Sequence, residues 1–181
     1  MFGGGSASGN TNDIFALSLN PDGEFWTELG VDPDGARPSP RTQASLVYDQ
    51  LNDRVILYSG YASSATLHDV WAFNLNERDS NWGKGALPTV NIPGGTSVGN
   101  AAIYDPTGQR MLVYRGHTGG LHSLTLDGGL VWSNLTDAST PSARRYPAVA
   151  YDPIRHAMIL QGASWEAPAP PTKPSGWTST T

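Results

Sequence analysis

The chain has 181 residues, a length typical of one domain, and 38% of them are hydrophobic, which is enough to bury a core. A net charge of −5 without any run of Lys or Arg argues against nucleic acid or an anionic membrane as a partner. The absence of cysteine excludes disulfides, cysteine-bound metal and thiol catalysis.

Targeting segments are not evident in the sequence. No apolar run reaches the 18 residues that indicate a membrane span, and the first residues, "MFGGGSASG", have neither a basic nor an apolar region. We therefore expect no transmembrane segment and no signal peptide, and the localisation of the protein stays open.

Short strands are predicted along the chain, and no amphipathic run with a cap predicts a helix. The segment 1–30 predicts the end of a strand at "MFGG", an alternating strand within "NDIFALSL" and a last strand near Trp26. The segment 41–87 predicts four strands, at 44–48, 55–58, 70–73 and from Trp82. The segment 97–136 predicts four more, and 144–162 predicts two, at 148–151 and 158–160.

These segments are copies of one repeat. The Tyr-Asp pairs that end the first strand begin at Tyr48, Tyr104 and Tyr151, with gaps of 56 and 47 residues. Glycines recur after the second strand at Gly4, Gly60, Gly116 and Gly162, and tryptophans close the repeats at Trp26, Trp82 and Trp132. A period near 50 residues is typical of β-propellers. We expect Trp82 and Trp132 to pack between sheets, and Gly116 to have a positive φ or a close backbone neighbour.

The turns carry their own signals. Asp49, Asp105 and Asp152 open the hairpin between the first and second strands, where an aspartate side chain accepts hydrogen bonds from the backbone two residues on. We interpret these three aspartates as structural residues.

The repeated residues resemble the kelch-repeat family, in the group with propellers like the galactose oxidase central domain. "PSPR" and "PSAR" place Arg41 and Arg144 before the first strand, "FGG" (2–4) supplies the diglycine, and "NDIF" and "HDVW" match the third strand. The sequence departs from the pattern where Ser59, Arg115 and Gln161 replace the first glycine, and where Ser97 replaces the arginine. In addition, Thr125-x-Asp127-x-Gly129-x-x-Trp132 fits the Asp-box turn of sialidase-like propellers.

The resemblance implies an all-β fold, a partial kelch-type β-propeller of about three blades of four-stranded antiparallel sheet. The blades span 1–30 (partial), 41–87, 97–136 and 144–162 (partial), and 163–181 is a Pro-rich loop or tail. Propellers close with about 4–8 blades. We therefore expect either a fragment of a larger propeller or a homodimer that closes the ring.

As a function, we expect a non-catalytic binding scaffold for protein or carbohydrate ligands. The loop face of the propeller carries the candidate ligand-binding residues, which are Tyr61, Arg115, His117, Arg145, Tyr146 and Trp165. Arg41 and Arg144 recur before the first strand, and we interpret them as structural. The alternative is a carbohydrate-active propeller enzyme, sialic-acid epimerase-like or sialidase-like.

No cofactor or metal site is expected. A copper-radical centre of the galactose oxidase type requires a cysteine, so that activity is rejected. His117 and His122 flank a turn, but no nearby carboxylate would complete a metal site. No catalytic residue is assigned.

Overall fold

A computed structural model describes residues 1–30, 35–75, 82, 87, 89, 92–93, 99–144 and 146–162. The described residues form twelve β-strands and no helix, so the expected all-β class is confirmed. None of them forms a helix of the length and apolarity needed to cross a membrane. The calls on Arg145, Trp165 and the segment 163–181 lie outside the described residues.

The strands form four small antiparallel sheets, none of which closes on itself. The first sheet contains β1 (Phe2–Ser6), β2 (Gly9–Ser18) and β3 (Phe25–Leu29). The second contains β4 (Ser45–Asp49), β5 (Arg54–Ala62) and β6 (Ala65–Asn74). The third contains β7 (Ala101–Asp105), β8 (Arg110–Tyr114), β9 (Leu121–Thr125) and β10 (Trp132–Asn134), and the fourth β11 (Ala148–Asp152) and β12 (Ala157–Gln161).

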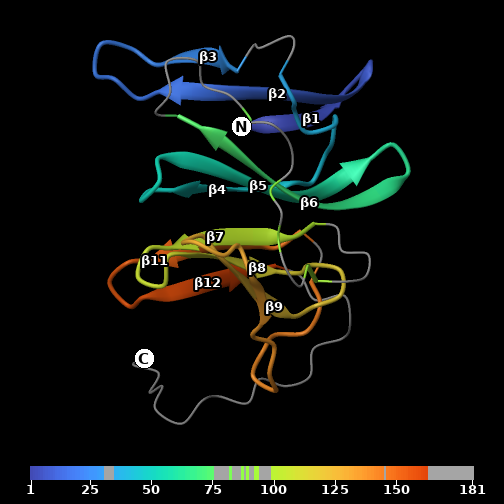
Figure 1. Cartoon of the computed structure of the whole chain (residues 1–181), viewed down its shortest axis with the longest axis vertical. Coiled ribbons are helices and arrows are strands. Elements are labelled where there is room, and N and C mark those ends of the chain that lie inside the picture. Colours follow the sequence, from blue (N-terminus) through green and yellow to red (C-terminus); the bar gives the residue numbers. More distant parts are fainter. Residues whose placement is uncertain are drawn as a thin grey trace, which may run out of the picture.

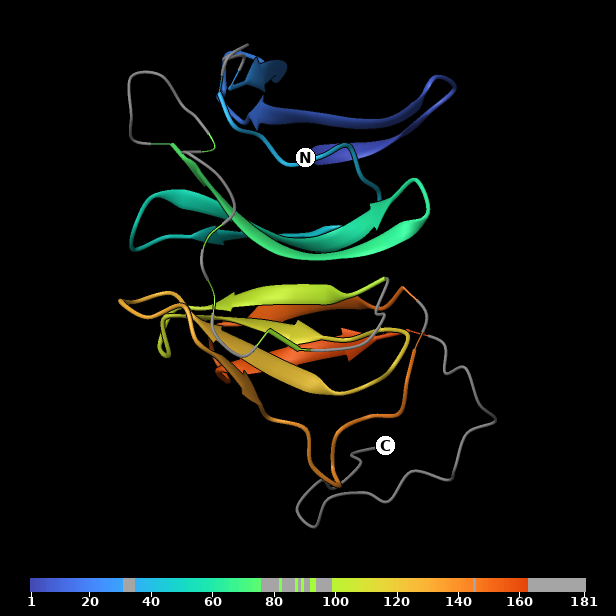
Figure 2. The ribbon, with the colours of Figure 1, turned by 45° about the vertical axis from the view of Figure 1, so that its right-hand side comes forward.

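The first and second sheets follow one another along the long axis of the molecule, and the third and fourth sheets lie beside each other toward its other end (Figure 1). Strand β4 packs beside β7, and β7 packs beside β11, so the first strands of consecutive repeats are neighbours. The tips of the β1–β2 and β5–β6 hairpins point to the same side of the molecule (Figure 2). We call this side the loop face.

The hairpins between first and second strands are held by their aspartates. Asp105 accepts hydrogen bonds from the backbone N–H groups of Thr107 and Gly108, at 3.1 Å each, and pairs with Arg110 at 2.8 Å. Asp152 accepts from the N–H of Ile154 at 2.9 Å in the same way. The side chains of these aspartates are therefore engaged in building the turns.

A bulge interrupts the second strand in the first two sheets. The register shifts between Phe2 and Gly4 and between Tyr58 and Gly60. In each bulge the middle residue is left-handed, with φ of 58° at Gly3 and 64° at Ser59. Because a left-handed backbone suits glycine, the diglycine of the sequence pattern marks this bulge.

Trp82 lies between the first and second sheets. Its ring packs 5.1 Å from the ring of Phe2 in the first sheet and 5.1 Å from that of Phe73 in the second. Ile14 and Leu57 complete this buried cluster. The burial predicted for Trp82 is confirmed, because only 4% of its surface is exposed.

Trp132 occupies the corresponding place between the second and third sheets. Its ring is 4.7 Å from that of Tyr58, which lies two residues before Gly60, as Phe2 lies two residues before Gly4. Trp132 is 2% exposed, as predicted. Trp26, the equivalent tryptophan of the first sheet, is instead 58% exposed, because no sheet among the described residues covers its face.

Backbone hydrogen bonds join consecutive sheets at the start of each repeat. The N–H of Gly4 donates to the carbonyl of Arg41 at 3.0 Å, and the N–H of Arg41 donates to the carbonyl of Thr11 at 3.0 Å. The N–H of Arg144 donates to the carbonyl of Gly116 at 2.8 Å. The segment before each of these first strands is thus anchored to the sheet that precedes it.

Gly116 has the close neighbour expected from the sequence. Its φ is not positive, but a Cβ placed on it would overlap the carbonyl oxygen of Gly99 and lie 2.9 Å from that of Arg144. Two backbone segments therefore leave no room for a side chain at this position.

Candidate functional site

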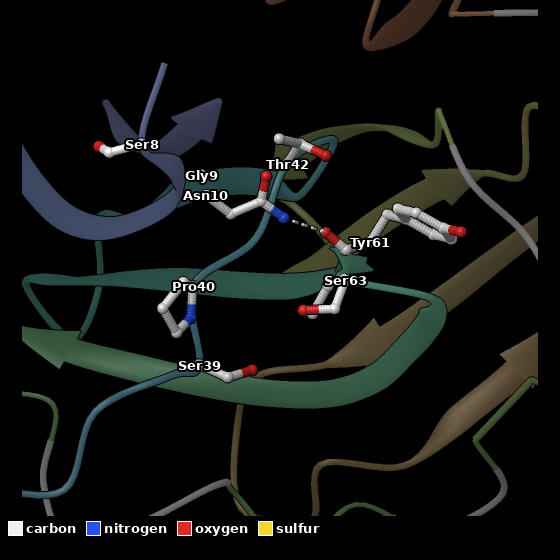
Figure 3. A pocket seen from close by; sticks show the side chains of 9 residues that line it. Ser8, Gly9, Asn10, Ser39, Pro40, Thr42, Tyr61 and Ser63 are labelled. Carbon is white, nitrogen blue, oxygen red and sulfur yellow. Dashed lines mark hydrogen bonds between the residues drawn. The ribbon is translucent and has the colours of Figure 1, made fainter. Parts of the chain in front are cut away.

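A cleft of about 520 Å³ opens on the loop face where the first and second sheets meet. Three segments form it: the β1–β2 turn, the residues that precede β4, and the β5–β6 turn (Figure 3). Its lining is neutral and consists of Ser8, Gly9, Asn10, Ser39, Pro40, Thr42, Tyr61, Ala62 and Ser63. We call it the Tyr61 cleft.

The backbone of Tyr61 is fixed from two sides. The N–H of Tyr61 donates to the carbonyl of Thr42 at 2.8 Å, and the N–H of Thr42 donates to the carbonyl of Tyr61 at 3.0 Å. From the first sheet, the Asn10 side-chain amide donates to the same Tyr61 carbonyl at 3.3 Å (Figure 3). The Tyr61 side chain, 37% exposed, therefore stands on an anchored backbone.

The Arg41 side chain holds in place the segments that form the cleft. Its guanidinium is fully buried, and all five of its N–H groups donate hydrogen bonds. Two go to the carboxylate of Asp69, at 2.5 and 2.9 Å, and one to the carbonyl of Ser59 at 3.0 Å. The other two go to the carbonyl and the hydroxyl of Ser39, at 3.0 and 3.2 Å. Arg41 is therefore a structural residue that ties the segment before β4 to its own sheet.

The Asp69 carboxylate is held in its charged form. Burial raises the pKa of Asp69, but hydrogen bonds from Arg41 and from the Trp71 indole, at 2.7 Å, outweigh burial and hold the pKa below its usual value. Such a bidentate pair is specific in geometry as well as strong.

Gly60 permits the close packing beneath Tyr61. Its φ is +120°, and a Cβ on it would lie 2.9 Å from Cδ of Arg41 and 3.0 Å from the carbonyl oxygen of Thr42. A side chain at this position would push apart the two segments that position Tyr61.

The other predicted ligand residues do not line this cleft. Arg115 is buried, with 8% of its surface exposed, so its side chain offers a ligand little area. His117 is exposed in the loop between β8 and β9. Tyr146 is 63% exposed, and its ring lies against Gly99. Of the six predicted ligand residues, Tyr61 alone lines the cleft among those that the structure describes.

Arg144 makes a contact like that of Arg41, and this contact corrects the position that the sequence alignment gave to Gly162. The Arg144 guanidinium donates to the carbonyl of Gly162 at 2.8 Å, 18 residues later, as Arg41 donates to the carbonyl of Ser59, also 18 residues later. Gly162 therefore corresponds to Ser59, one position before the repeated glycines Gly60 and Gly116. The shorter spacing in the last copy caused the misalignment.

A second, smaller cavity lies between the third and fourth sheets. It measures about 230 Å³ and is bordered by Tyr114, Leu121, Leu135, Met158 and Leu160, among others. The Tyr114 hydroxyl donates hydrogen bonds to the carbonyls of Pro141 and Ser142. The cavity is mainly apolar, and it lies between two sheets, at a place comparable to that of Trp132 beside Tyr58.

Sequence reasoning missed Asn10, Ser39, Thr42 and Ser63 as cleft residues. Asn10 lies at the start of β2, Ser39 and Thr42 precede β4, and Ser63 lies in the β5–β6 turn, so only the fold brings these polar residues together. Their one shared signal in the sequence is position, since they lie near the repeated glycine bulge or in the segment that precedes a first strand.

No group of three or more His, Asp or Glu side chains in the described part of the chain is arranged to hold a metal ion. Comparison of the sequence with models of protein families, and with curated proteins, finds no match.

Proposed function

We propose that this chain is an arc of a kelch-like β-propeller that acts as a non-catalytic binding scaffold, with the Tyr61 cleft as its ligand site. The observation that carries the proposal is the chemistry of the cleft, whose lining combines hydroxyl and amide groups with no Lys, Arg, Asp or Glu, and in which Tyr61 is the only ionisable side chain. Such a surface suits recognition of a ligand by hydrogen bonding.

The arrangement of the sheets supports the propeller part of the proposal. Consecutive sheets pack face to face, the first strands of the second, third and fourth sheets are neighbours, and a tryptophan fills each of the first two interfaces. In a propeller the first strands line the central axis, and the loops between second and third strands share one face with the segments between blades. The Tyr61 cleft is built from those two kinds of segment.

The ion pairs support the non-catalytic part of the proposal. Glycoside chemistry uses a pair of carboxylic acids, or other acid and base groups, that face the substrate. Asp49, Asp69, Asp105 and Asp152 are each bound to an arginine within the scaffold. These carboxylates are engaged in holding turns and strands.

The test is to incubate the purified chain with panels of glycans and of peptides, and to measure both retention and turnover. The proposal predicts saturable retention of at least one ligand class with no product formed. Hydrolysis or anomerisation above background would instead favour the carbohydrate-active enzyme, and no retention of any class would contradict the scaffold.

A further inference from the structure

We infer that the first sheet of this chain docks on the fourth sheet of a second copy, with Trp26 of one copy packed on Ile159 of the other. The inference goes beyond the ligand-binding function and does not depend on the Tyr61 cleft. It follows from exposed apolar side chains on the first and fourth sheets, which lie toward opposite ends of the molecule (Figure 1), and from the interfaces between sheets inside the chain.

The first sheet has an apolar outer face. Leu17 and Trp26 lie directly opposite each other in the β2–β3 ladder, so their side chains share a face. Ile14 is three residues before Leu17 and points the other way, into the buried cluster with Trp82. Leu17 and Trp26 therefore point away from the second sheet, with 38% and 58% of their surfaces exposed.

The fourth sheet also has an outer face. Met158 and Leu160 border the cavity between the third and fourth sheets, so they point toward the third sheet. Because side chains alternate along a strand, Ile159 and Gln161 lie on the opposite face of β12. Ala150 is the cross-strand partner of Ile159, and all three of these outer residues are exposed, Ile159 by 52%.

The second sheet shows what covers a face of this kind. The registers of the β4–β5 and β11–β12 hairpins align Ile159 with Ile56 and Ala150 with Val47. Ile56 is 0% and Val47 6% exposed, because both belong to the buried cluster that contains Trp132 of the third sheet. The equivalent face of the fourth sheet is therefore suited to accept a tryptophan from another sheet of the same repeat.

Trp26 is a tryptophan that lacks such a contact among the described residues. Its equivalents Trp82 and Trp132 both pack on the preceding sheet, with ring centroids 5.1 Å from Phe2 and 4.7 Å from Tyr58. If the first sheet of one copy covers the fourth sheet of another, the same arrangement forms once more, and the exposed Trp26 ring leaves water.

The contact between copies should be weaker than the contacts inside the chain. Ala150 and Gln161 stand where the second sheet has Val47 and Tyr58, so less apolar surface is available to bury. Association should therefore depend on concentration, and dilution separates the copies. Because the two faces differ, the contact is head-to-tail, and each copy uses one face for each neighbour.

Three variants test the inference. Trp26→Glu places a charge on the outer face of the first sheet, and Ile159→Glu does so on the outer face of the fourth. Ile154→Glu is the matched control, since Ile154 is an isoleucine in the turn of the same β11–β12 hairpin and is 83% exposed. All three side chains are more than half exposed in the single chain, and thermal melting establishes that each variant folds.

The measurement is sedimentation equilibrium from about 1 µM to about 1 mM, the range of dissociation constants of weak interfaces. For the parent chain and the Ile154 variant, we expect the average mass to rise with concentration above the 19.2 kDa of one chain. We expect Trp26→Glu and Ile159→Glu each to weaken association about tenfold or more, as loss of a central aromatic or aliphatic contact does.

Mixing the two defective variants tests the head-to-tail arrangement. The Trp26 variant keeps an intact fourth sheet and the Ile159 variant keeps an intact first sheet. An equimolar mixture should therefore associate with the affinity of the parent chain, but only as pairs of one copy of each, since the remaining faces both carry the new glutamate.

Four results would overturn the inference. The first is a parent chain that stays at 19.2 kDa over the whole concentration range. The second is association that Trp26→Glu abolishes and Ile159→Glu does not, because two first sheets would then meet each other. The third is a mixture that does not associate, and the fourth is equal weakening by the Ile154 control. None of these results bears on ligand retention by the Tyr61 cleft.

Discussion

The first and second sheets carry the same apolar pattern with opposite burial. Leu17 and Trp26 in the first sheet correspond, 56 residues earlier, to Phe73 in β6 and to Trp82, which follows β6 in the chain. Leu17 is 38% and Trp26 58% exposed, whereas Phe73 is 0% and Trp82 4% exposed. The members of each pair share a position in the repeat but differ in what faces them, because Phe2 and Ile14 of the first sheet pack against Phe73 and Trp82.

This difference in exposure shows that a repeat of this kind does not bury its own aromatic residues. Each sheet receives its core from the sheet before it, as in repeat proteins whose stability depends on contacts between neighbouring units. The face of the first sheet that carries Leu17 and Trp26 has the chemistry of an interface and, among the described residues, has no covering sheet. Mutations at equivalent residues of different repeats therefore test whether a residue depends on the sheet that covers it.

The largest contrast is expected for the tryptophans. Trp82→Ala should destabilise the chain by about 4 kcal/mol, because it leaves a cavity among Phe2, Phe73 and Leu57. Trp26→Ala should cost less than about 1 kcal/mol, as exposed substitutions do. Urea denaturation of both variants measures the contrast, and equal losses would mean that Trp26 is buried in solution.

The repeated glycines give the next contrast. Gly116→Ala should cost about 3 kcal/mol, because the new methyl group would meet the carbonyls of Gly99 and Arg144. A Cβ at Gly4 meets nothing within 4 Å, so Gly4→Ala should cost only the conformational strain of its φ of +131°, about 1 kcal/mol. Thermal melting ranks the two. A smaller loss at Gly116 than at Gly4 would contradict the close packing.

A third contrast concerns the aspartates of the third strand. Asp69→Asn should destabilise the chain by about 2 kcal/mol at pH 7, because the buried Arg41 loses its charged partner. Asp13, the equivalent residue 56 positions earlier, has no ion pair with a described residue, so Asp13→Asn should change stability by less than about 0.5 kcal/mol.

The effect at Asp69 should depend on pH. Its pKa in the folded protein lies below the unfolded value of about 4, so the ion pair stabilises the fold above that pH and loses its contribution as the pH falls through the folded pKa. Denaturation curves at pH 7 and near pH 3 should show the difference between parent and Asp69→Asn shrinking at the lower pH. If the difference in unfolding free energy between the two proteins did not change with pH, the destabilisation would come from packing and not from the ion pair.

The sequence predicted most of the described strands because each has a local signal, but Trp82, where a fourth strand of the second repeat was expected to begin, lies in no strand. The alternation in 70–73, the Asp-containing hairpins and the glycine bulges depend on residues close in the chain, and the burial of Trp82 and Trp132 followed from their recurrence. The exposure of Trp26 did not follow, since it depends on a neighbouring sheet. Gly162 was misaligned because it lies 11 residues after Tyr151, whereas Gly60 and Gly116 lie 12 residues after their tyrosines.

The candidate site was predictable only in part. Tyr61 stood out as an aromatic residue just after a repeated glycine. Asn10 and Ser39 did not, because their roles come from contacts with Tyr61 and Arg41 in other segments. Hydrogen-bonding direction is a property of the folded neighbourhood and has no signature in the local sequence.

The most direct test of the binding account is to follow the backbone amide resonances of the chain by nuclear magnetic resonance during titration with the glycan or peptide that the chain retains best. The account predicts saturable shifts at Asn10, Thr42, Tyr61 and Ser63, with little change around His117 and Tyr146. Shifts centred on His117 and Tyr146, or on the face that carries Trp26, would place the ligand elsewhere and contradict the account.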